Sequence, residues 1–437
     1  TVNLAPAELR KEGTALDLPI AVAIALARAG KPSPPASAFL GELALDGSIR
    51  HVDGVLVAAR GLARMGYQTV FVPQVDAAEA TLVDGLEVIP CPSLAAVVNH
   101  LLGVEAIAKA TATVGMAAPG AIEHDLAEIH GQEEAKRALE VAAAGGHHLL
   151  LSGPPGAGKT MLARCLPGIL PPLELHEALE VAQVRSLLGE LPRDGPLDWT
   201  RPFRAPHHSV STAGLIGGGS GLALPGEISR AHHGVLFLDE LAEFQTPVLQ
   251  ALRQPLESAR VTITRSGGSV TYPARFGLIA ATNPCPCGWA GDNVRACRCA
   301  PGGIDSYQRR LSGPLLDRID LQVTVRRVPL DSLASEPSGE ASDRVRERVV
   351  AARRRQFDRQ GCLNAQLKPA RLRQLAGLTP TSRRTLERWG AQRGLTARGF
   401  HRAWRVARTA SDLDGTEQID EPHVLEALGF RLQDAAA

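Results

Sequence analysis

An apolar run at residues 149–151 passes directly into the glycine-rich segment GPPGAGKT at residues 153–160. This is the pattern GxxxxGK followed by Ser or Thr, in which glycines lacking a Cβ let successive backbone N–H groups wrap a phosphate. The pattern needs a strand before it and a helix after it, whose N-terminus adds partial positive charge. A chance match in a chain of this length is below about one in a hundred. The segment therefore predicts an α/β fold with a phosphate-binding loop.

Each residue of this loop has an expected place around a nucleotide. Lys159 is expected to reach the β and γ phosphates, and the Thr160 hydroxyl to ligate Mg²⁺. The other residues expected to surround the nucleotide are Gly153, Pro154, Pro155, Gly156, Ala157, Gly158 and Met161. The sequence thus predicts ATP and Mg²⁺ as cofactors, with a ligand-free glycine-rich turn as the alternative.

Two further apolar strands end in polar side chains. GVLFLDEL at residues 234–241 contains Asp239 and Glu240, and FGLIAATN at residues 276–283 ends in Asn283. A carboxylate at the C-terminal end of a parallel strand can hold the Mg²⁺ shell, so Asp239 is expected there. Glu240 is then placed to act as general base on the attacking water, which Asn283 would orient.

Arg318 lies between apolar residues in LSGPLLDRID at residues 311–320. One interpretation is a surface arginine at the end of a helix. The other is a finger that enters the site of a neighbouring subunit and neutralises charge on the transferring phosphate.

Eight ordered motifs together resemble the AAA+ ATPases, and specifically the magnesium-chelatase-like ComM/YifB family. They cover essentially the whole chain and read KEGTALDLPIA, GELALDGSIR, GPPGAGKTML, RPFRAPHHS, PGEISRAHHGVLFLDEL, ATNPCPCG, LSGPLLDRIDL and ARGFHRAWRVARTASDL. The resemblance implies a hexameric ring motor with Asn283 as sensor 1 and Arg318 as trans-acting finger. It also implies Arg398 as the sensor 2 arginine of a helical lid, with nearby alternatives at Arg402, Arg405 and Arg408.

The fold implied is α/β: an AAA+ P-loop NTPase core with a parallel sheet and a helical lid, preceded by a Lon-protease-like (S5-type) α+β domain. The expected units are a Lon-like domain at 1–103, a small-residue linker at 104–120, an ATPase core with helix-2 and pre-sensor-1 insertions at 121–328, a hinge at 329–342 and an Arg-rich helical lid at 343–437. Within the first unit we expect a hairpin at 41–55 turning at Asp46-Gly47, a helix at 55–66 and a strand at 69–73.

The Lon-like unit lacks the residues that Lon-type proteases use for catalysis. A nucleophilic serine needs a nearby base, and these proteases use a Ser–Lys dyad. KEGTALDL offers Thr14 and no serine, and GVLVAARGLA at 54–63 holds no lysine. We therefore expect a non-proteolytic domain. The chain opens on Thr1, so we also expect the first strands of this domain to be missing from the sequence.

The two insertions are expected at GLIGGGSGLALPGEISRA (214–231) and ARVTITRSGGSVTYPARF (259–276). In the second, alternating apolar residues flank a Ser-Gly-Gly-Ser turn, which predicts a hairpin. In the ring motors that this chain resembles, such hairpins point into the central pore; a purely structural hairpin is the alternative. The residues expected to contact DNA are Arg265, Ser266, Gly267 and Gly268.

The charge distribution bears on the partner. The net charge is only +1, but residues 341–410 hold 18 Lys and Arg against 4 Asp and Glu, a local charge of +14. Such a block can be a solvated helical surface or can follow a phosphate backbone.

Together with the family resemblance, this basic block favours an ATP-driven motor on single-stranded or branched DNA. The implied activity is helicase or branch migration in recombination during natural transformation, by a homo-hexamer. A magnesium-chelatase motor subunit inserting metal into a porphyrin is the alternative. A non-catalytic nucleotide-binding scaffold is disfavoured because Lys159, Asp239 and Glu240 are all present.

The composition excludes an integral membrane protein and an intrinsically disordered protein. Hydrophobic residues make up 44% and charged residues 21%, as in ordinary globular proteins. The longest apolar run, residues 18–27, is half of the roughly 20 residues that a membrane-spanning helix needs. No apolar segment of a signal peptide opens the chain, so we expect a cytoplasmic protein without a membrane partner.

Four of the seven cysteines cluster as two C-x-C pairs around a nine-residue loop: Cys285, Cys287, Cys297 and Cys299. Four thiolates at close spacing can hold a structural Zn²⁺ in tetrahedral geometry, while free or paired thiols are the alternative. Three histidine pairs, at 147–148, 207–208 and 232–233, match no familiar zinc spacing. For these we expect packing or hydrogen bonding rather than metal ligation.

Overall fold

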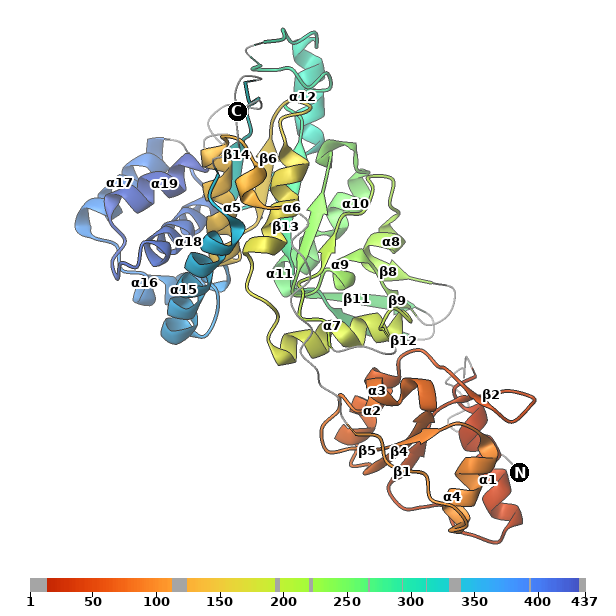
Figure 1. Ribbon diagram of the computed structural model, residues 1–437. Helices are drawn as coiled ribbons and strands as arrows, with labels where there is room; N and C mark the ends of the chain where they lie inside the picture. The colour runs from red at the N-terminus through yellow and green to blue at the C-terminus, as the bar shows by residue number, and fades with distance from the viewer. Residues whose placement is uncertain are drawn as a thin grey trace.

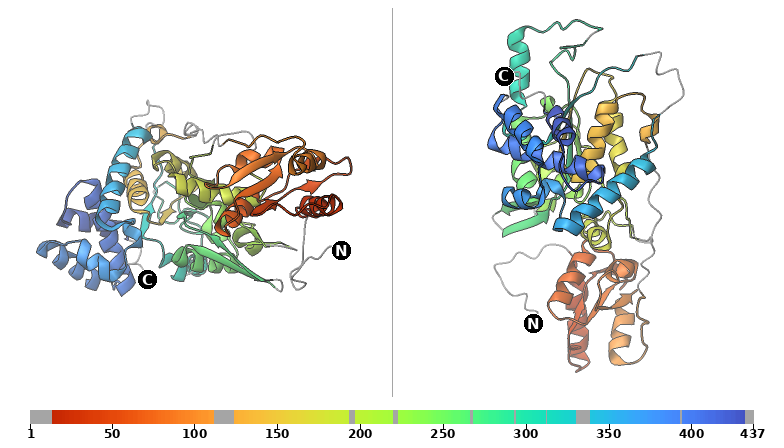
Figure 2. Two further views of the ribbon diagram at one scale, coloured as in Figure 1. Left: turned by 90° about the horizontal axis from the view of Figure 1, so that it is seen from below. Right: turned by 90° about the vertical axis from the view of Figure 1, so that its left-hand side faces the viewer.

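The computed structural model describes most of the chain. The described residues are 14–111, 124–192, 197–219, 223–265, 268–292, 294–311, 313–329, 339–392 and 394–431. Figures 1 and 2 show three units: an N-terminal one in red and orange, a central one around a sheet, and a C-terminal helical one in blue. Among the described residues, no helix combines the length and the apolar character needed to pass through a bilayer.

The central unit is built on five parallel strands in the order β14-β6-β13-β10-β7. The strands are β6 (Leu149–Ser152), β7 (Phe203–Arg204), β10 (Val235–Leu238), β13 (Gly277–Thr282) and β14 (Leu321–Thr324). Three of them, β6, β10 and β13, confirm the strands predicted from apolar runs. Parallel strands covered on both faces are apolar throughout, which is why no polar alternation marks them in the sequence.

Successive residues of these strands enter two different cores. Leu149 and Leu151 pack in the core that contains α5 (Glu133–Gly145) and α6 (Lys159–Ile169). Leu150 packs on the opposite face, in the core that contains α10 (Thr246–Ala251). Side chains alternate between the two faces along a strand, and each face has its own core, so both faces of the sheet are buried. This burial fixes the strand ends from which the loops at the sheet edge begin.

The two insertions pack on one another. The first comprises α8 (Thr212–Ile216), β8 (Gly217–Gly218), β9 (Leu224–Pro225) and α9 (Glu227–Arg230). The second follows α11 (Arg253–Ser258) and is the predicted hairpin, with β11 (Arg260–Arg265) antiparallel to β12 (Gly268–Pro273). The hydroxyl of Tyr272 donates to the carbonyl of Ala223, and Ile263 lies against Gly217. The predicted turn residues Ser266 and Gly267 lie outside the described part of the chain.

The N-terminal unit holds a parallel sheet in the order β1-β4-β5. Its elements are α1 (Asp17–Arg28), β1 (Ser37–Phe39), β2 (Glu42–Leu43), β3 (Ile49–Arg50), α2 (Val55–Arg64), β4 (Thr69–Pro73), α3 (Ala77–Ala80), β5 (Glu87–Cys91) and α4 (Leu94–Leu102). The predicted hairpin, helix and strand are confirmed as β2–β3, α2 and β4, and the Asp46 carboxylate accepts the backbone N–H of Ser48 in the hairpin turn. The described sheet differs from the α+β expectation, because helices lie between its parallel strands as in α/β units.

The N-terminal unit contacts the central one through α2 and α7 (Leu175–Leu187). Leu56 is buried in a cluster with Leu173 and Val181, and the backbone N–H of Gly54 donates to the carbonyl of Ser186 at 3.0 Å. The predicted linker at 104–120 is described only to residue 111, and the backbone N–H of Ala110 donates to Val88 of β5. The first part of this segment therefore packs along the sheet edge.

The C-terminal unit is helical in its described part, as the Arg-rich pattern predicted; the predicted hinge residues 330–338 are outside the description. Its helices are α15 (Ser342–Gln360), α16 (Pro369–Leu375), α17 (Pro380–Gln392), α18 (Ala397–Leu413) and α19 (Glu421–Gly429). Some arginines of the basic block pair with buried carboxylates of the same chain: Arg348 with Glu140 at 2.6 Å, and Arg359 with Asp412 at 2.7 Å. Both carboxylates lie outside residues 341–410, so the local charge of +14 overstates the positive charge facing solvent.

A buried polar network joins the sheet to this helical unit. Asp320, just before β14, accepts from His147 Nδ1 at 3.2 Å and lies 3.5 Å from Arg402 of α18. Nε2 of His147 bonds the Thr409 hydroxyl at 2.8 Å. Burial alone would raise the pKa of Asp320, but the hydrogen bond and charge of His147 and the charges of His148 and Arg402 hold it well below its usual 3.8. The ionised carboxylate therefore ties the two units together.

Asp320→Ala should lower the free energy of unfolding by about 3 to 5 kcal/mol, because it leaves buried cationic and imidazole groups without their partner. A thermal melt at neutral pH checks this, with Asp358→Ala as control, since Asp358 is 74% exposed and 3.9 Å from Arg354. The native carboxyl has the lower pKa, so the contribution is present above about pH 4 and is lost as the pH falls further. Equal melting temperatures for the two variants at pH 7 would contradict the assignment.

Candidate nucleotide-binding and hydrolysis site

The glycine-rich loop connects the end of β6 to the start of α6, as the sequence pattern requires. Gly156 and Gly158 have φ of +75° and +88°, a region that residues with a Cβ seldom adopt. A Cβ on Gly153 would lie 2.1 Å from the carbonyl oxygen of Val325. The glycines are therefore needed for the path of the loop as well as for room around a phosphate.

Lys159 begins α6 and turns back into the loop. Its ammonium group donates to the carbonyls of Gly153 and Pro154 at 2.6 and 2.9 Å, and to Oδ1 of Asn283 at 3.2 Å. Burial lowers the pKa of Lys159, and the nearby Asp239 and Glu240 carboxylates oppose this shift. The amine is thus held where the loop would cradle phosphates.

The two predicted magnesium ligands meet across the sheet edge. The Thr160 hydroxyl donates to Oδ2 of Asp239 at 2.8 Å, joining α6 to the end of β10. The next residue, Glu240, has φ of +51° and a carboxylate that is 54% exposed. A non-glycine residue in this region is uncommon and is often found at functional sites. Here the turn aims Asp239 at Thr160 and leaves Glu240 open to solvent.

The structure therefore brings together Lys159 and Thr160 from the first turn of α6, Asp239 from the end of β10 and Asn283 from the end of β13. Oxygen ligands from a hydroxyl and a carboxylate suit Mg²⁺, which keeps several waters and uses few protein ligands. The amine and the loop N–H groups suit the phosphates. The residues present fit ATP with Mg²⁺.

His208 is a neighbour of Glu240, although the sequence predicted only packing or hydrogen bonding for this histidine and no place in the nucleotide site. Its Nδ1 lies 3.5 Å from Oε2 of Glu240, and its ring lies edge-on to Phe244. The available signal was the histidine pair in RPFRAPHHS, which follows β7, the strand next to β10. Its significance depended on the order of the strands, which the sequence does not show.

The predicted arginines of the ATPase lie apart from this cluster. Arg318 is only 16% exposed and pairs with Glu257 of α11 in the same chain. Arg398 is exposed in the first turn of α18, beside the Thr396 N-cap. Of the alternatives, Arg402 faces Asp320, and Arg408 is fully buried with its guanidinium 2.9 Å from Asp412. Arg408 is therefore a structural residue of the helical unit, while the sensor 2 assignment of Arg398 stays a prediction.

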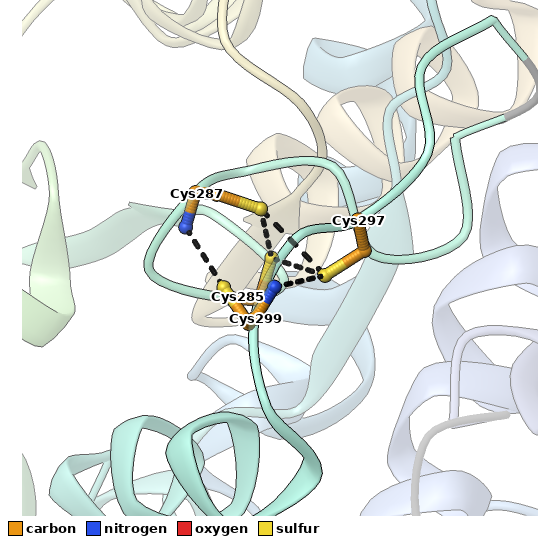
Figure 3. A group of neighbouring side chains, drawn as sticks. All are labelled: Cys285, Cys287, Cys297 and Cys299. Atoms are coloured by element: carbon orange, nitrogen blue, oxygen red, sulfur yellow. Dashed lines mark hydrogen bonds between the residues drawn. The ribbon is translucent and has the colours of Figure 1, made fainter.

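The four clustered cysteines come together in space. They lie in the segment between β13 and α12 (Pro301–Arg310), with all four sulfurs within 4.8 Å of one another (Figure 3). The other three cysteines are separate free thiols, of which Cys91 and Cys165 are buried and Cys362 is half-buried.

The three histidine pairs have hydrogen-bond or ion-pair partners, in line with the interpretation that the sequence favoured. His147 contacts Asp320 and Thr409 as described above, and Nδ1 of His148 accepts the backbone N–H of Leu278. Nε2 atoms of His232 and His233 both lie within 2.9 Å of one Glu180 oxygen. These three residues could also hold a metal ion, so the metal interpretation stays open at this one pair.

Three family models match the chain. "Magnesium chelatase, subunit ChlI" covers residues 125–333, the model for its C-terminal part covers 339–431, and "Subunit ChlI of Mg-chelatase" covers 1–76. The Magnesium-chelatase 38 kDa subunit of Rhodobacter capsulatus is 28% identical over 173 residues, which is 36% of this chain and 49% of that protein.

Several curated relatives match along nearly the whole chain, and two of them are described here. "Uncharacterized protein YifB" of Salmonella typhimurium is 44% identical over 438 residues, covering 99% of this chain and 85% of the relative. "Competence protein ComM" of Haemophilus influenzae is 44% identical over 440 residues, again covering 99% and 85%. With the phosphate-binding loop, the parallel sheet and these matches taken together, the chain belongs to the magnesium-chelatase-like ComM/YifB family of AAA+ proteins.

Proposed function

We propose that this protein is an ATP-driven ring motor that acts on single-stranded or branched DNA, with helicase or branch-migration activity in recombination during natural transformation. The observation that carries the ATPase part is the contact of Lys159 with Asn283 and of Thr160 with Asp239 at one edge of the sheet. The DNA part is supported by the relative named a competence protein and by the hairpin β11–β12, whose strand end carries an exposed arginine, Arg265.

Each side chain of this site has a separate proposed role in ATP hydrolysis. When bound, ATP supplies the phosphoryl group and Mg²⁺ neutralises the developing charge. Lys159 binds the phosphates, and Thr160 and Asp239 would hold the metal ion. Glu240 takes a proton from the attacking water, which Asn283 orients, and the nearby His208 restrains the Glu240 carboxylate. Exposure of Glu240 gives it access to that water.

The ring is proposed to be a homo-hexamer, in which Arg318 serves the site of the neighbouring subunit and Arg398 acts as sensor 2. Within one chain Arg318 is paired with Glu257, so the finger role requires that contact to be exchanged at the subunit boundary. A site completed by a neighbour couples hydrolysis to relative subunit motion.

The hairpin is proposed to carry the DNA contacts. Val261 and Tyr272 are buried against the insertions, which fixes the base of the hairpin, while Arg265 at the tip of β11 is exposed. Arginine and backbone N–H groups at a loop tip suit a phosphate chain without reading its bases. Arg265, Gly268 and the turn between them would contact the strand in the pore.

The N-terminal unit is proposed to be a Lon-like domain without protease activity. The Thr14 hydroxyl donates to Glu42 rather than to a basic group that could activate it. A chelatase motor subunit remains the second candidate, supported by the names of the matching family models. The chelatase relatives, however, match only 36% of this chain, against 99% for the ComM and YifB relatives.

Lys159→Ala should abolish most ATP binding, because it removes the charge next to the β and γ phosphates. Glu240→Gln should keep nucleotide affinity and lower kcat by at least about a hundredfold, since it removes the general base. A fluorescent ATP analogue measures binding, and phosphate release measures turnover. Normal hydrolysis by Glu240→Gln would show that another group activates the water.

Arg318→Ala should lower kcat by about a thousandfold while the subunits still assemble. Mixing it with Lys159→Ala subunits should restore part of the activity, because a Lys159→Ala subunit still offers Arg318 to the intact loop of its neighbour. Assembly is followed by light scattering and turnover by phosphate release. Mixed rings as inactive as either variant alone would show that Arg318 does not act across a boundary.

Arg265→Ala should lower strand displacement or branch migration much more than ATP hydrolysis without DNA, because Arg265 lies outside the nucleotide cluster. Arg260→Ala at the exposed base of the same strand is the matched control and should change neither. DNA binding should weaken with salt and show no sequence preference. If Arg265→Ala instead fails to assemble, the hairpin is a subunit contact rather than a DNA contact.

A further inference from the structure

Three sulfur–sulfur distances in the four-cysteine cluster are close to those around a tetrahedral metal ion, and the fourth sulfur lies within 4.8 Å of the others. Sγ of Cys285 lies 3.4 Å from Cys287 and 3.7 Å from Cys297, and Cys287 lies 3.6 Å from Cys297 (Figure 3). A disulfide needs about 2.0 Å between sulfurs. Zinc–sulfur bonds of about 2.3 Å in a tetrahedron separate sulfurs by about 3.8 Å. The spacing is therefore that of metal ligands and not of a disulfide.

Backbone groups orient the ligands. The backbone N–H groups of Ala290 and Cys287 donate to the sulfurs of Cys285 and Cys299 at 3.3 and 3.4 Å, and that of Cys299 donates to Cys297 at 3.4 Å. Hydrogen bonds of this kind fix the direction of metal-bound thiolates. With four sulfur ligands no position is left for water, so the ion would be structural.

The segment that carries the cysteines is held by side-chain and packing contacts and not by regular secondary structure. Its described residues between β13 and α12 form no helix or strand. Trp289 lies 4.4 Å from the guanidinium of Arg327, and Asp292 lies 3.6 Å from the same arginine. These contacts fix the part of the loop around Trp289 and Asp292, and a metal ion would fix the part that carries the four cysteines.

This loop is in direct contact with the nucleotide site. Cys285 follows Asn283 by two residues, and Asn283 accepts from Lys159. A Cβ on Gly288 would lie only 2.5 Å from Cδ of Pro155, so the loop backbone rests on the phosphate-binding loop. Anything that fixes the cysteine loop therefore also fixes the positions of Asn283 and Pro155.

We propose that Cys285, Cys287, Cys297 and Cys299 bind one Zn²⁺, and that this ion holds Asn283 and Pro155 in place for ATP turnover. The cysteines are positioning residues: they act through the loop and touch neither phosphate nor Mg²⁺. Soft thiolate ligands in tetrahedral geometry select zinc over the oxygen-preferring ions of the neighbouring site. The second half of the proposal rests on the proposed ATPase activity, and the first half does not.

Metal analysis of the full chain, purified under reducing conditions, tests the zinc site. About one zinc per chain is expected, with loss of zinc in Cys297→Ser and retention in Cys362→Ser, whose half-buried cysteine lies outside the cluster. An optical spectrum without the visible absorption of an iron–sulfur cluster supports zinc. Reduced wild-type protein without bound metal, or with iron in place of zinc, overturns the proposal.

Nucleotide binding and turnover test the positioning role. Cys297→Ser should lower kcat by about tenfold, because loss of the ion frees the loop that carries Asn283 and rests on Pro155. Cys362→Ser should retain wild-type kcat. Folded, zinc-free Cys297→Ser with wild-type turnover overturns the positioning role. If wild-type protein hydrolyses no ATP, the proposed function fails, while zinc content and protection of residues 284–300 from proteolysis still decide the zinc site.

Discussion

The parallel pairing of β6 with β13 is the constraint on which the rest of the site depends. Ser152 pairs with Thr282, and the backbone N–H of Gly153 donates to Thr282, so the phosphate-binding loop and Asn283 leave the sheet side by side. β10 pairs on the other side of β13, which brings Asp239 to the same edge. Burial of both sheet faces keeps this register, since a slip of one residue would send every strand side chain into the wrong core.

Arginine in this protein serves two different purposes. In the C-terminal unit, Arg359 and Arg408 both pair with the buried carboxylate of Asp412, where the planar guanidinium makes several directed hydrogen bonds. At the hairpin tip, Arg265 is exposed. A count of basic residues does not distinguish arginines in buried ion pairs from exposed arginines. The buried pairs contribute little to the electrostatic potential at the surface that a nucleic acid would contact. For this reason the DNA contact is proposed at the hairpin and not at the C-terminal unit.

The loop after β13 places a cluster of four cysteines next to the nucleotide site. In the proposed mechanism Asn283 orients the attacking water, and this requires a side chain whose backbone does not move. The strand supplies that rigidity on one side of Asn283. On the other side the chain enters an irregular segment, whose sulfurs lie at ligand distances and whose Gly288 rests on Pro155. The positions of Asn283 and of Pro155 in the phosphate-binding loop thus both depend on the cysteine loop.

The sequence by itself determined strands β4, β6, β10 and β13, the phosphate-binding loop, the β2–β3 and β11–β12 hairpins and the helical character of the C-terminal unit. These depend on local causes: apolar runs, glycines at positive φ and alternation around short turns. Only the tertiary structure placed His208 beside Glu240, paired Arg318 with Glu257 and set Gly288 against Pro155. Those contacts join residues that are 32, 61 and 133 positions apart in the sequence. Strand order and packing decide such contacts, and no local pattern encodes either.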